Sequence, residues 1–213
     1  MKRALSVAAL ACGLGCSVGA GEGTARGPIR VPACEIDDAR FDLEPDFFGG
    51  DWYGGTFTIQ LSHGGDTGEF NDALLFRVLD TSYVAAHLGE RIPVGPAGVA
   101  PVQATLRLSR SCGRQNVARW SPNGALEAYA GYIVFQSIYR GSPNADAPQR
   151  LTDVTAFSLS LRDPRQLREI SPLQPSTSAS VGQEPEVLPP ASGELEGSFS
   201  FYFTRGRPAQ RFQ

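Results

Sequence analysis

The side chains that most often carry acid–base chemistry are scarce in this 213-residue sequence, which has two histidines, His63 and His87. His63 precedes two glycines, a pattern typical of a turn, and His87 lies in a segment without a clear pattern. A Ser–His–Asp triad is recognised by its geometry, and the sequence alone gives no such geometry for either histidine. We therefore predict no catalytic residue, and we favour a protein that is not an enzyme over a secreted hydrolase.

Lysine chemistry is excluded from the body of the chain. Of the 19 basic residues, only Lys2 is a lysine and the rest are arginines. Schiff bases and P-loop phosphate sites both need a lysine in the folded domain. The formal net charge of −3 also argues against a general nucleic-acid binder. We expect no cofactor and no nucleic-acid partner.

Two groups of acidic residues contain oxygen ligands of the kind that calcium prefers. One group holds Asp37 and Asp38, and the other holds Asp66, Glu69 and Asp72. Calcium takes about six to eight oxygens, and neither group has the spacing of an EF-hand loop. We therefore expect no metal site and interpret these acids as solvated partners of arginines, with calcium binding at either group as the alternative.

Aromatic residues near expected turns are the better candidates for ligand binding. Trp52 and Tyr53 stand between two Gly-Gly pairs, and Trp120 directly precedes the turn-like segment 121–124. Aromatic faces at loop ends provide a large contact area at low entropy cost, which suits stacking on a sugar or on a protein. The alternative is that the three side chains plug the ends of the folded domain.

The N-terminus has the layout of a secretory signal. Lys2 and Arg3 form a short positive region, and residues 4–14 are apolar or small without a charge. This apolar run is shorter than a membrane-spanning helix and ends in small residues before Cys16. We therefore predict export, with residues 1–15 as the signal peptide.

Residues 13–16, Gly-Leu-Gly-Cys, resemble the lipobox of bacterial lipoproteins. In that family the signal is cleaved just before a cysteine that carries a diacylglycerol, which implies lipid attachment at Cys16. The usual aliphatic residue three places before the cysteine is Gly13 here, and Leu14 stands one place later. Cys12, with the same shift, is the alternative lipid site, and ordinary secretion is a further one. Because Ser17 rather than aspartate follows the cysteine, the resemblance implies the outer membrane of a two-membrane cell.

Cys34 and Cys112 are the remaining thiols if Cys16 is lipidated. An even pair in an oxidising compartment is most simply a disulfide. The alternative is a metal site or a reactive thiol. It is less favoured, because neither cysteine lies in a C-x-x-C or C-x-x-H arrangement.

The body of the chain reads as β-strands. Apolar and polar residues alternate with a period of two in four segments, residues 56–62, 102–109, 157–162 and 198–204. In residues 73–79 and 129–138 the odd and the even positions are both apolar, which predicts central strands or strands covered on both faces. With about seven to nine strands, we predict an all-β fold, an antiparallel β-sandwich or jelly roll. A short helical turn is expected near residues 81–88.

Gly and Pro content sets the expected domain organisation. Residues 16–33 are Gly-rich with little to bury, which predicts a tether between the lipid and the domain. Residues 34–213 are expected to form a single domain, with the Pro- and Ser-rich residues 171–192 as a flexible internal loop.

The order of signal, cysteine, Gly-rich tether and β-rich body resembles that of lipid-anchored proteins of Gram-negative bacteria. The resemblance implies a protein of the cell envelope, held at the membrane by its N-terminal lipid and exposed to the periplasm or the cell surface. We therefore expect a binding or structural role, with an envelope protein or a glycan as partner. A carbohydrate-binding module is the alternative.

Overall fold

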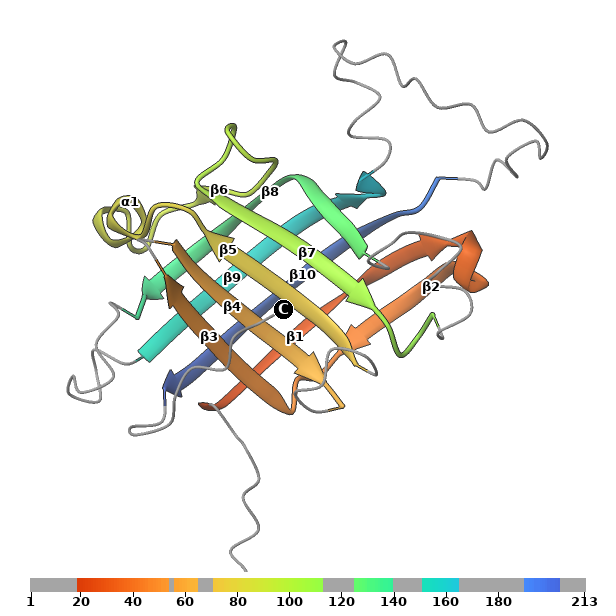
Figure 1. Ribbon diagram of the computed structural model, residues 1–213, viewed down its shortest axis with the longest axis horizontal. Helices are drawn as coiled ribbons and strands as arrows, with labels where there is room; N and C mark the ends of the chain where they lie inside the picture. Colours follow the sequence, from red (N-terminus) through yellow and green to blue (C-terminus); the bar gives the residue numbers. More distant parts are fainter. Residues whose placement is uncertain are drawn as a thin grey trace, which may run out of the picture.

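In a computed structural model, antiparallel strands that form one curled sheet make up most of the residues that the structure describes (Figure 1). The structure describes residues 19–53, 56–64, 71–112, 125–139, 151–164 and 190–203. The strands are β1 (Gly19–Val31), β2 (Ile36–Leu43), β3 (Phe47–Tyr53), β4 (Thr56–His63), β5 (Asp72–Val78), β6 (Ile92–Pro93), β7 (Val102–Leu108), β8 (Ala125–Ser137), β9 (Leu151–Arg162) and β10 (Ser192–Phe203). A 3-10 turn, η1 (Pro32–Cys34), joins β1 to β2, and one short helix, α1 (Thr81–Ala86), follows β5.

The strand order is β2-β1-β10-β9-β8-β7-β5-β4-β3, with β6 paired to β8 beside this path. The two apolar runs are confirmed as central strands, since residues 73–78 lie in β5 and residues 129–137 lie in β8. The all-β class is therefore confirmed. The predicted sandwich of two sheets is not confirmed, because the described strands belong to one continuous sheet.

The prediction of a tether is wrong for residues 19–31, which form β1 between β10 and β2. The glycines mislead because they suggest flexibility, whereas here they permit close approach to β10. A Cβ atom at Gly27 would overlap the carbonyl of Glu194, and one at Gly21 would overlap Phe201. Ala25 is fully buried between these strands. β1 is thus an integral strand of the sheet.

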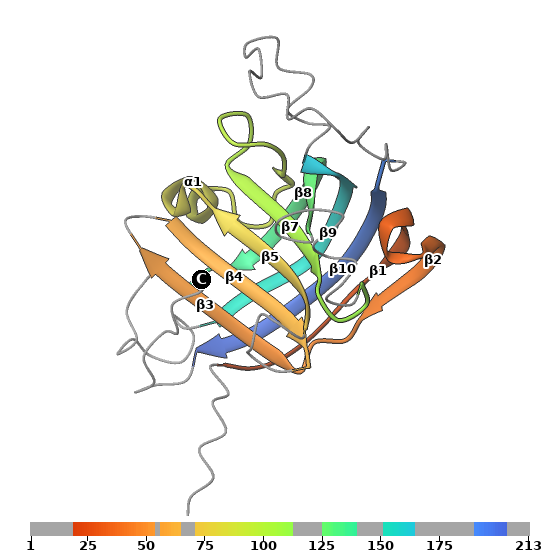
Figure 2. The same cartoon turned by 45° about the vertical axis from the view of Figure 1, so that its right-hand side comes forward.

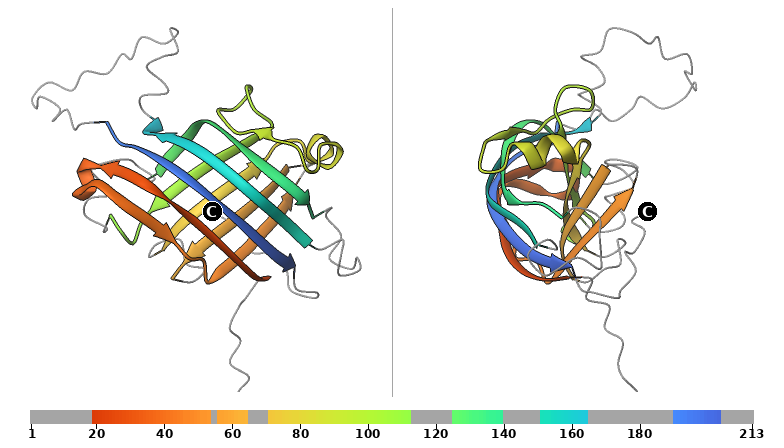
Figure 3. Two further views of the ribbon diagram at one scale, coloured as in Figure 1. Left: turned by 180° about the vertical axis from the view of Figure 1, so that it is seen from behind. Right: turned by 90° about the vertical axis from the view of Figure 1, so that its left-hand side faces the viewer.

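The sheet curls until strands that are distant in the order touch across a common interior. Figure 3 shows this in its right-hand view, where the strands wrap around a shared core. Phe48 on the edge strand β3 stacks on Phe201 of β10, with ring centroids 5.8 Å apart. The inward-facing residues at alternate positions are the apolar ones, as the period of two predicts. The largest fully buried side chains include five phenylalanines, namely Phe57, Phe76, Phe135, Phe157 and Phe201.

Helix α1 agrees with the helical turn expected at residues 81–88. Asp80 caps it, because its Oδ1 accepts a hydrogen bond of 2.9 Å from the backbone N–H of Tyr83. In Figures 1 and 2, α1 lies at the left of the view, and η1 lies at the right beside the edge strand β2. Within the described ranges, no helix has the length and apolar character that crossing a membrane requires. The expected flexible loop, residues 171–192, lies outside the described residues except for its last three.

Candidate functional site

β6 and the residues after it separate β7 from β8. The backbone N–H of Val94 donates to the carbonyl of Gly131 on β8, and that of Gly95 donates to Val102 on β7, both at 3.0 Å. β7 and β8 consequently pair directly only where residues 105–107 face residues 125–127. Beyond this short ladder the two strands diverge, and the segment 94–96 fills part of the gap.

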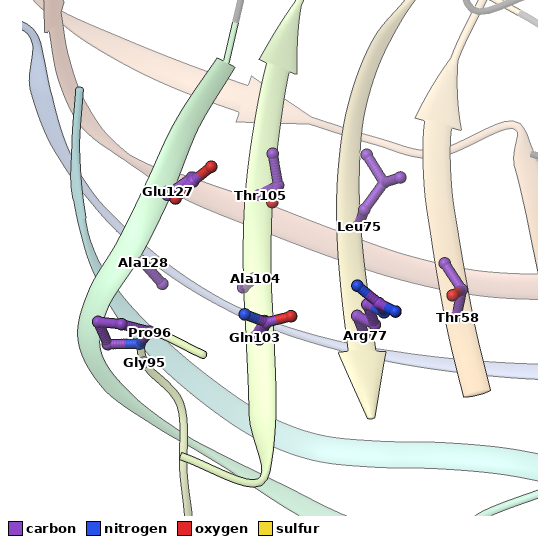
Figure 4. A pocket seen from close by; sticks show the side chains of 10 residues that line it. All are labelled: Thr58, Leu75, Arg77, Gly95, Pro96, Gln103, Ala104, Thr105, Glu127 and Ala128. Atoms are coloured by element: carbon purple, nitrogen blue, oxygen red, sulfur yellow. The ribbon is translucent and has the colours of Figure 1, made fainter. Parts of the chain in front are cut away.

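A groove of about 340 Å³ lies on the outer face of the sheet where these strands diverge (Figure 4). The residues that line it come from β4, β5, β7 and β8 and from the segment after β6: Thr58, Leu75, Arg77, Gly95, Pro96, Gln103, Ala104, Thr105, Glu127 and Ala128. The side chains on β5 and β7 alternate with buried core residues, so the core and the groove are opposite faces of the same strands.

Arg77 is the charged residue at one end of the groove. Thr58 of β4 and Gln103 of β7 are its direct cross-strand neighbours, so the three side chains share one row (Figure 4). Arg77 is exposed, and among the residues that the structure describes it makes no ion pair. The row therefore presents a guanidinium, a hydroxyl and an amide to solvent, which together can donate several hydrogen bonds.

Glu127 marks the other end of the groove. It pairs with Thr105 on one side and directly faces Arg162 of β9 on the other. Paired residues lie on the same face of a sheet, so the positive charge of Arg162 is near the carboxylate of Glu127. Arg162 also stacks over the ring of Tyr129, with its Cζ 3.9 Å from the ring centroid. Among the described residues no ion pair joins Arg162 to Glu127, so each end of the groove carries one charged side chain, and only the Glu127 end has a charged cross-strand neighbour, of opposite sign.

A second, more open depression lies on the outer face of β1, β9 and β10. Its lining includes two carboxylates, Glu22 and Asp153, with Ser200 between them in the same cross-strand row. Apart from these acids it is lined largely by small residues, so nothing further singles it out as a binding site.

The predicted disulfide is present. Cys34 at the end of η1 bonds to Cys112, which follows β7, and their Cα atoms are 4.6 Å apart. Both residues are buried. Because η1 adjoins the β1–β2 side of the sheet while β7 lies near its middle, the bond connects two regions that are not hydrogen-bonded neighbours.

The acidic candidates fall in separate environments. Asp72 is buried and accepts hydrogen bonds from the backbone N–H groups of Arg110 and Ser111, both at 3.1 Å, and from the Ser111 hydroxyl. Asp37 pairs with Arg30 at 3.2 Å, and Asp38 is exposed.

Asp66 and Glu69 lie outside the described residues. Over the described part of the chain, no three metal-ligating side chains gather in one place. The same acidic segment supplies partners to Arg26, which pairs with Asp42 at 2.8 Å and with Glu44 at 2.9 Å. The hydrogen bond and the charge of Asp42 raise the pKa of Arg26 above its ordinary value.

The two histidines each bind a nearby backbone carbonyl. The Nδ1 of His63 lies 3.0 Å from the carbonyl oxygen of Glu44, and that of His87 lies 2.8 Å from that of Tyr83. The His87 ring also stacks on the Tyr83 ring, with centroids 4.1 Å apart. These contacts hold each ring against the backbone. Neither histidine lines the groove.

The side chains of the proposed stacking residues and of the lipid site lie outside what the structure describes. Trp52 and Tyr53 belong to β3, where their backbones pair with Phe57 and Thr56 of β4, but their side chains lie outside the described set. Trp120 and Cys16 also fall outside the described residues.

The sequence reasoning missed the groove. Its polar residues occupy ordinary outward positions of alternating strands, and nothing in their spacing along the chain links them. The one sequence feature that points to the groove is residues 92–98, where prolines and glycines interrupt the chain between two strand-like runs. Such a segment must leave the regular ladder, but its insertion between β7 and β8 depends on the register.

Comparison with known proteins found no matching family model and no significantly similar curated protein or solved structure.

Proposed function

We propose that this chain is an exported, lipid-anchored protein of the cell envelope whose folded body acts by binding a partner. The observation that supports export most directly is the buried Cys34–Cys112 disulfide. Disulfides persist in oxidising compartments such as the periplasm and the cell surface, and they are rare in the cytosol. Export also agrees with the signal-like residues 1–15.

The binding role is supported by the outer groove. Its lining presents a guanidinium, an amide, hydroxyls and a carboxylate, without a histidine or a cysteine. These groups recognise ligands by hydrogen bonds and charge. Recognition without a reaction is the function that this set of groups supports best.

The anchor is tested by metabolic labelling with a palmitate analogue in a Gram-negative host. We expect the wild-type chain to incorporate the label, the Cys16→Ala variant to lose it, and the Cys12→Ala variant to keep it. Fractionation is expected to move the Cys16→Ala variant from the membrane pellet to the soluble fraction. Labelling that persists in Cys16→Ala but is lost in Cys12→Ala would move the anchor to Cys12, and labelling of neither wild type nor variants would refute lipidation.

Carbohydrate binding is a second candidate function, favoured by the hydroxyl- and amide-lined groove. Trp52, Tyr53 and Trp120 remain candidate stacking residues for such a ligand. A glycan array with the wild-type protein tests this function, and we expect Trp52→Ala and Trp120→Ala to weaken retention if these side chains take part. An array on which no glycan is retained would remove this candidate.

A further inference from the structure

We propose that the groove between β4, β5, β7 and β8 binds the carboxylate of an acidic saccharide, with Arg77 as the residue that pairs with that carboxylate. This inference rests on the proposed binding function and assigns to it a site and a ligand class. Thr58 and Gln103 flank Arg77 in one cross-strand row, so both can donate hydrogen bonds to the same anionic group.

The charge distribution favours an anionic ligand. The two cross-strand neighbours of Arg77, Thr58 and Gln103, are uncharged, whereas Glu127 has the cation Arg162 as a cross-strand neighbour. A cationic ligand would meet Arg77 without compensation, and its attraction to Glu127 would be reduced by Arg162. A single carboxylate matches the groove because a planar guanidinium binds it through two parallel hydrogen bonds.

The rest of the lining fits the body of a sugar. Thr105 and Gln103 offer polar groups to hydroxyls, and Glu127 can accept hydrogen bonds from hydroxyls at the far end. Leu75 and Pro96 supply apolar surface against which the C–H face of a pyranose can pack.

The dimensions indicate a ligand longer than one sugar ring. Arg77 and Glu127 are separated by two strand spacings across the sheet and by two residues along it, which corresponds to about 12 Å between their Cα atoms. The groove volume of about 340 Å³ lies in the range of small-molecule sites. A short oligosaccharide with an acidic residue at the Arg77 end spans this distance.

The groove wall is held independently of any ligand. Val94 and Gly95 are hydrogen-bonded to β8 and β7 respectively, which fixes Pro96 beside the row of Arg77. A site that is formed before binding loses less conformational entropy on association. Substitutions on the outward face therefore test recognition without removing a core contact.

The experiment is isothermal titration of the exported chain with a trisaccharide that carries one uronic acid at its end as the acidic probe and the neutral trisaccharide of the same linkage as its uncharged counterpart. We expect the acidic probe to bind the wild type and the neutral one to bind at least tenfold more weakly. Arg77→Gln is expected to weaken binding of the acidic probe by about tenfold or more, because it removes a charged hydrogen-bond pair. Arg77→Lys should recover only part of the loss.

The matched control is Arg40→Gln on β2, an exposed arginine whose removal changes the net charge equally. It should leave the affinity within twofold of the wild type. Equal losses in Arg40→Gln and Arg77→Gln, or equal binding of the neutral probe, would overturn the assignment of Arg77.

A third probe, an acidic tripeptide, distinguishes the ligand class. Tighter binding of the peptide than of the acidic trisaccharide would overturn the saccharide assignment, and so would failure of the acidic probe to bind. Either result leaves the anchor to be judged by the palmitate labelling alone, so the two proposals fail separately.

Discussion

The rings of Phe76 on β5 and Phe157 on β9 meet edge to face, with their centroids 5.3 Å apart and their planes at 65°. β7 and β8 lie between these strands in the sheet, so the contact runs across the interior and not along a ladder. Phe76 also lies 5.5 Å from the ring of Phe199 on β10. The side chain of Phe76 thus links the two halves of the curled sheet.

Phe76→Ala is expected to lower the free energy of unfolding by about 3–5 kcal/mol, because it removes a fully buried ring and leaves a cavity. Urea unfolding followed by fluorescence measures the change. The control is Leu75→Ala, the adjacent outward-facing residue, which should cost clearly less since its side chain is only half-buried. Similar losses in the two variants would contradict a core on the Phe76 face.

Replacing both Cys34 and Cys112 by alanine is expected to cost about 2–5 kcal/mol of stability, because the bond closes a loop between residues 78 apart in sequence. The comparison is between the two proteins in urea without reductant. Denatured wild-type protein should also resist alkylation at both positions until a reductant is added. Alkylation of either cysteine before reduction would contradict the disulfide.

Gly131→Ala is expected to destabilise the protein by about 3 kcal/mol, through backbone strain and a steric overlap combined. Gly131 has a φ of 152°, and a Cβ atom there would overlap the carbonyl of Ser158 on β9. Gly98→Ala is the matched control, since Gly98 has a φ of 77° but no atom within 4 Å of the added carbon. It should cost only about 1 kcal/mol, the strain alone. Thermal melts of the two variants measure the difference, and equal melting temperatures would refute the close approach of β8 to β9.

Stability is expected to fall as the pH rises above about 10, the ordinary pKa of tyrosine, in part because of Tyr139. Burial raises the pKa of Tyr139, whose ring packs against Phe57 with centroids 5.7 Å apart. The unfolded chain therefore releases this proton at a lower pH than the folded one. The contribution of neutral Tyr139 is complete below the unfolded pKa and decreases as the pH rises toward the folded pKa.

The measurement is the midpoint of urea unfolding between pH 9 and pH 11. Tyr139→Phe should flatten the decline, whereas Tyr202→Phe, at an exposed ring, should leave it unchanged. An identical slope in wild type and Tyr139→Phe would show that Tyr139 does not contribute.

The alternation of apolar and polar residues was sufficient to predict the all-β class and to separate inward from outward positions on β7 and β9. This works because side chains alternate strictly between the two faces of a strand. The pairing of Cys34 with Cys112 was also predictable, since the sequence left these as the two thiols of the expected mature body.

Gly19–Val31 could not be predicted as a strand from its own residues. Its glycines fit against β10 through contacts with Phe201 and Glu194, which lie far along the chain. Local composition cannot distinguish a flexible glycine from one that allows two backbones to approach closely.

The sequence by itself determined the strand-rich class, the buried face of the regular strands, the disulfide pair and the absence of lysine beyond Lys2. Only the tertiary structure decided that the strands form one curled sheet, and that Thr58, Arg77 and Gln103 stand in one row beside the segment 94–96. The physical reason is that a period of two specifies which face a side chain occupies. The neighbour across the ladder depends on register and strand order, which long-range pairing sets.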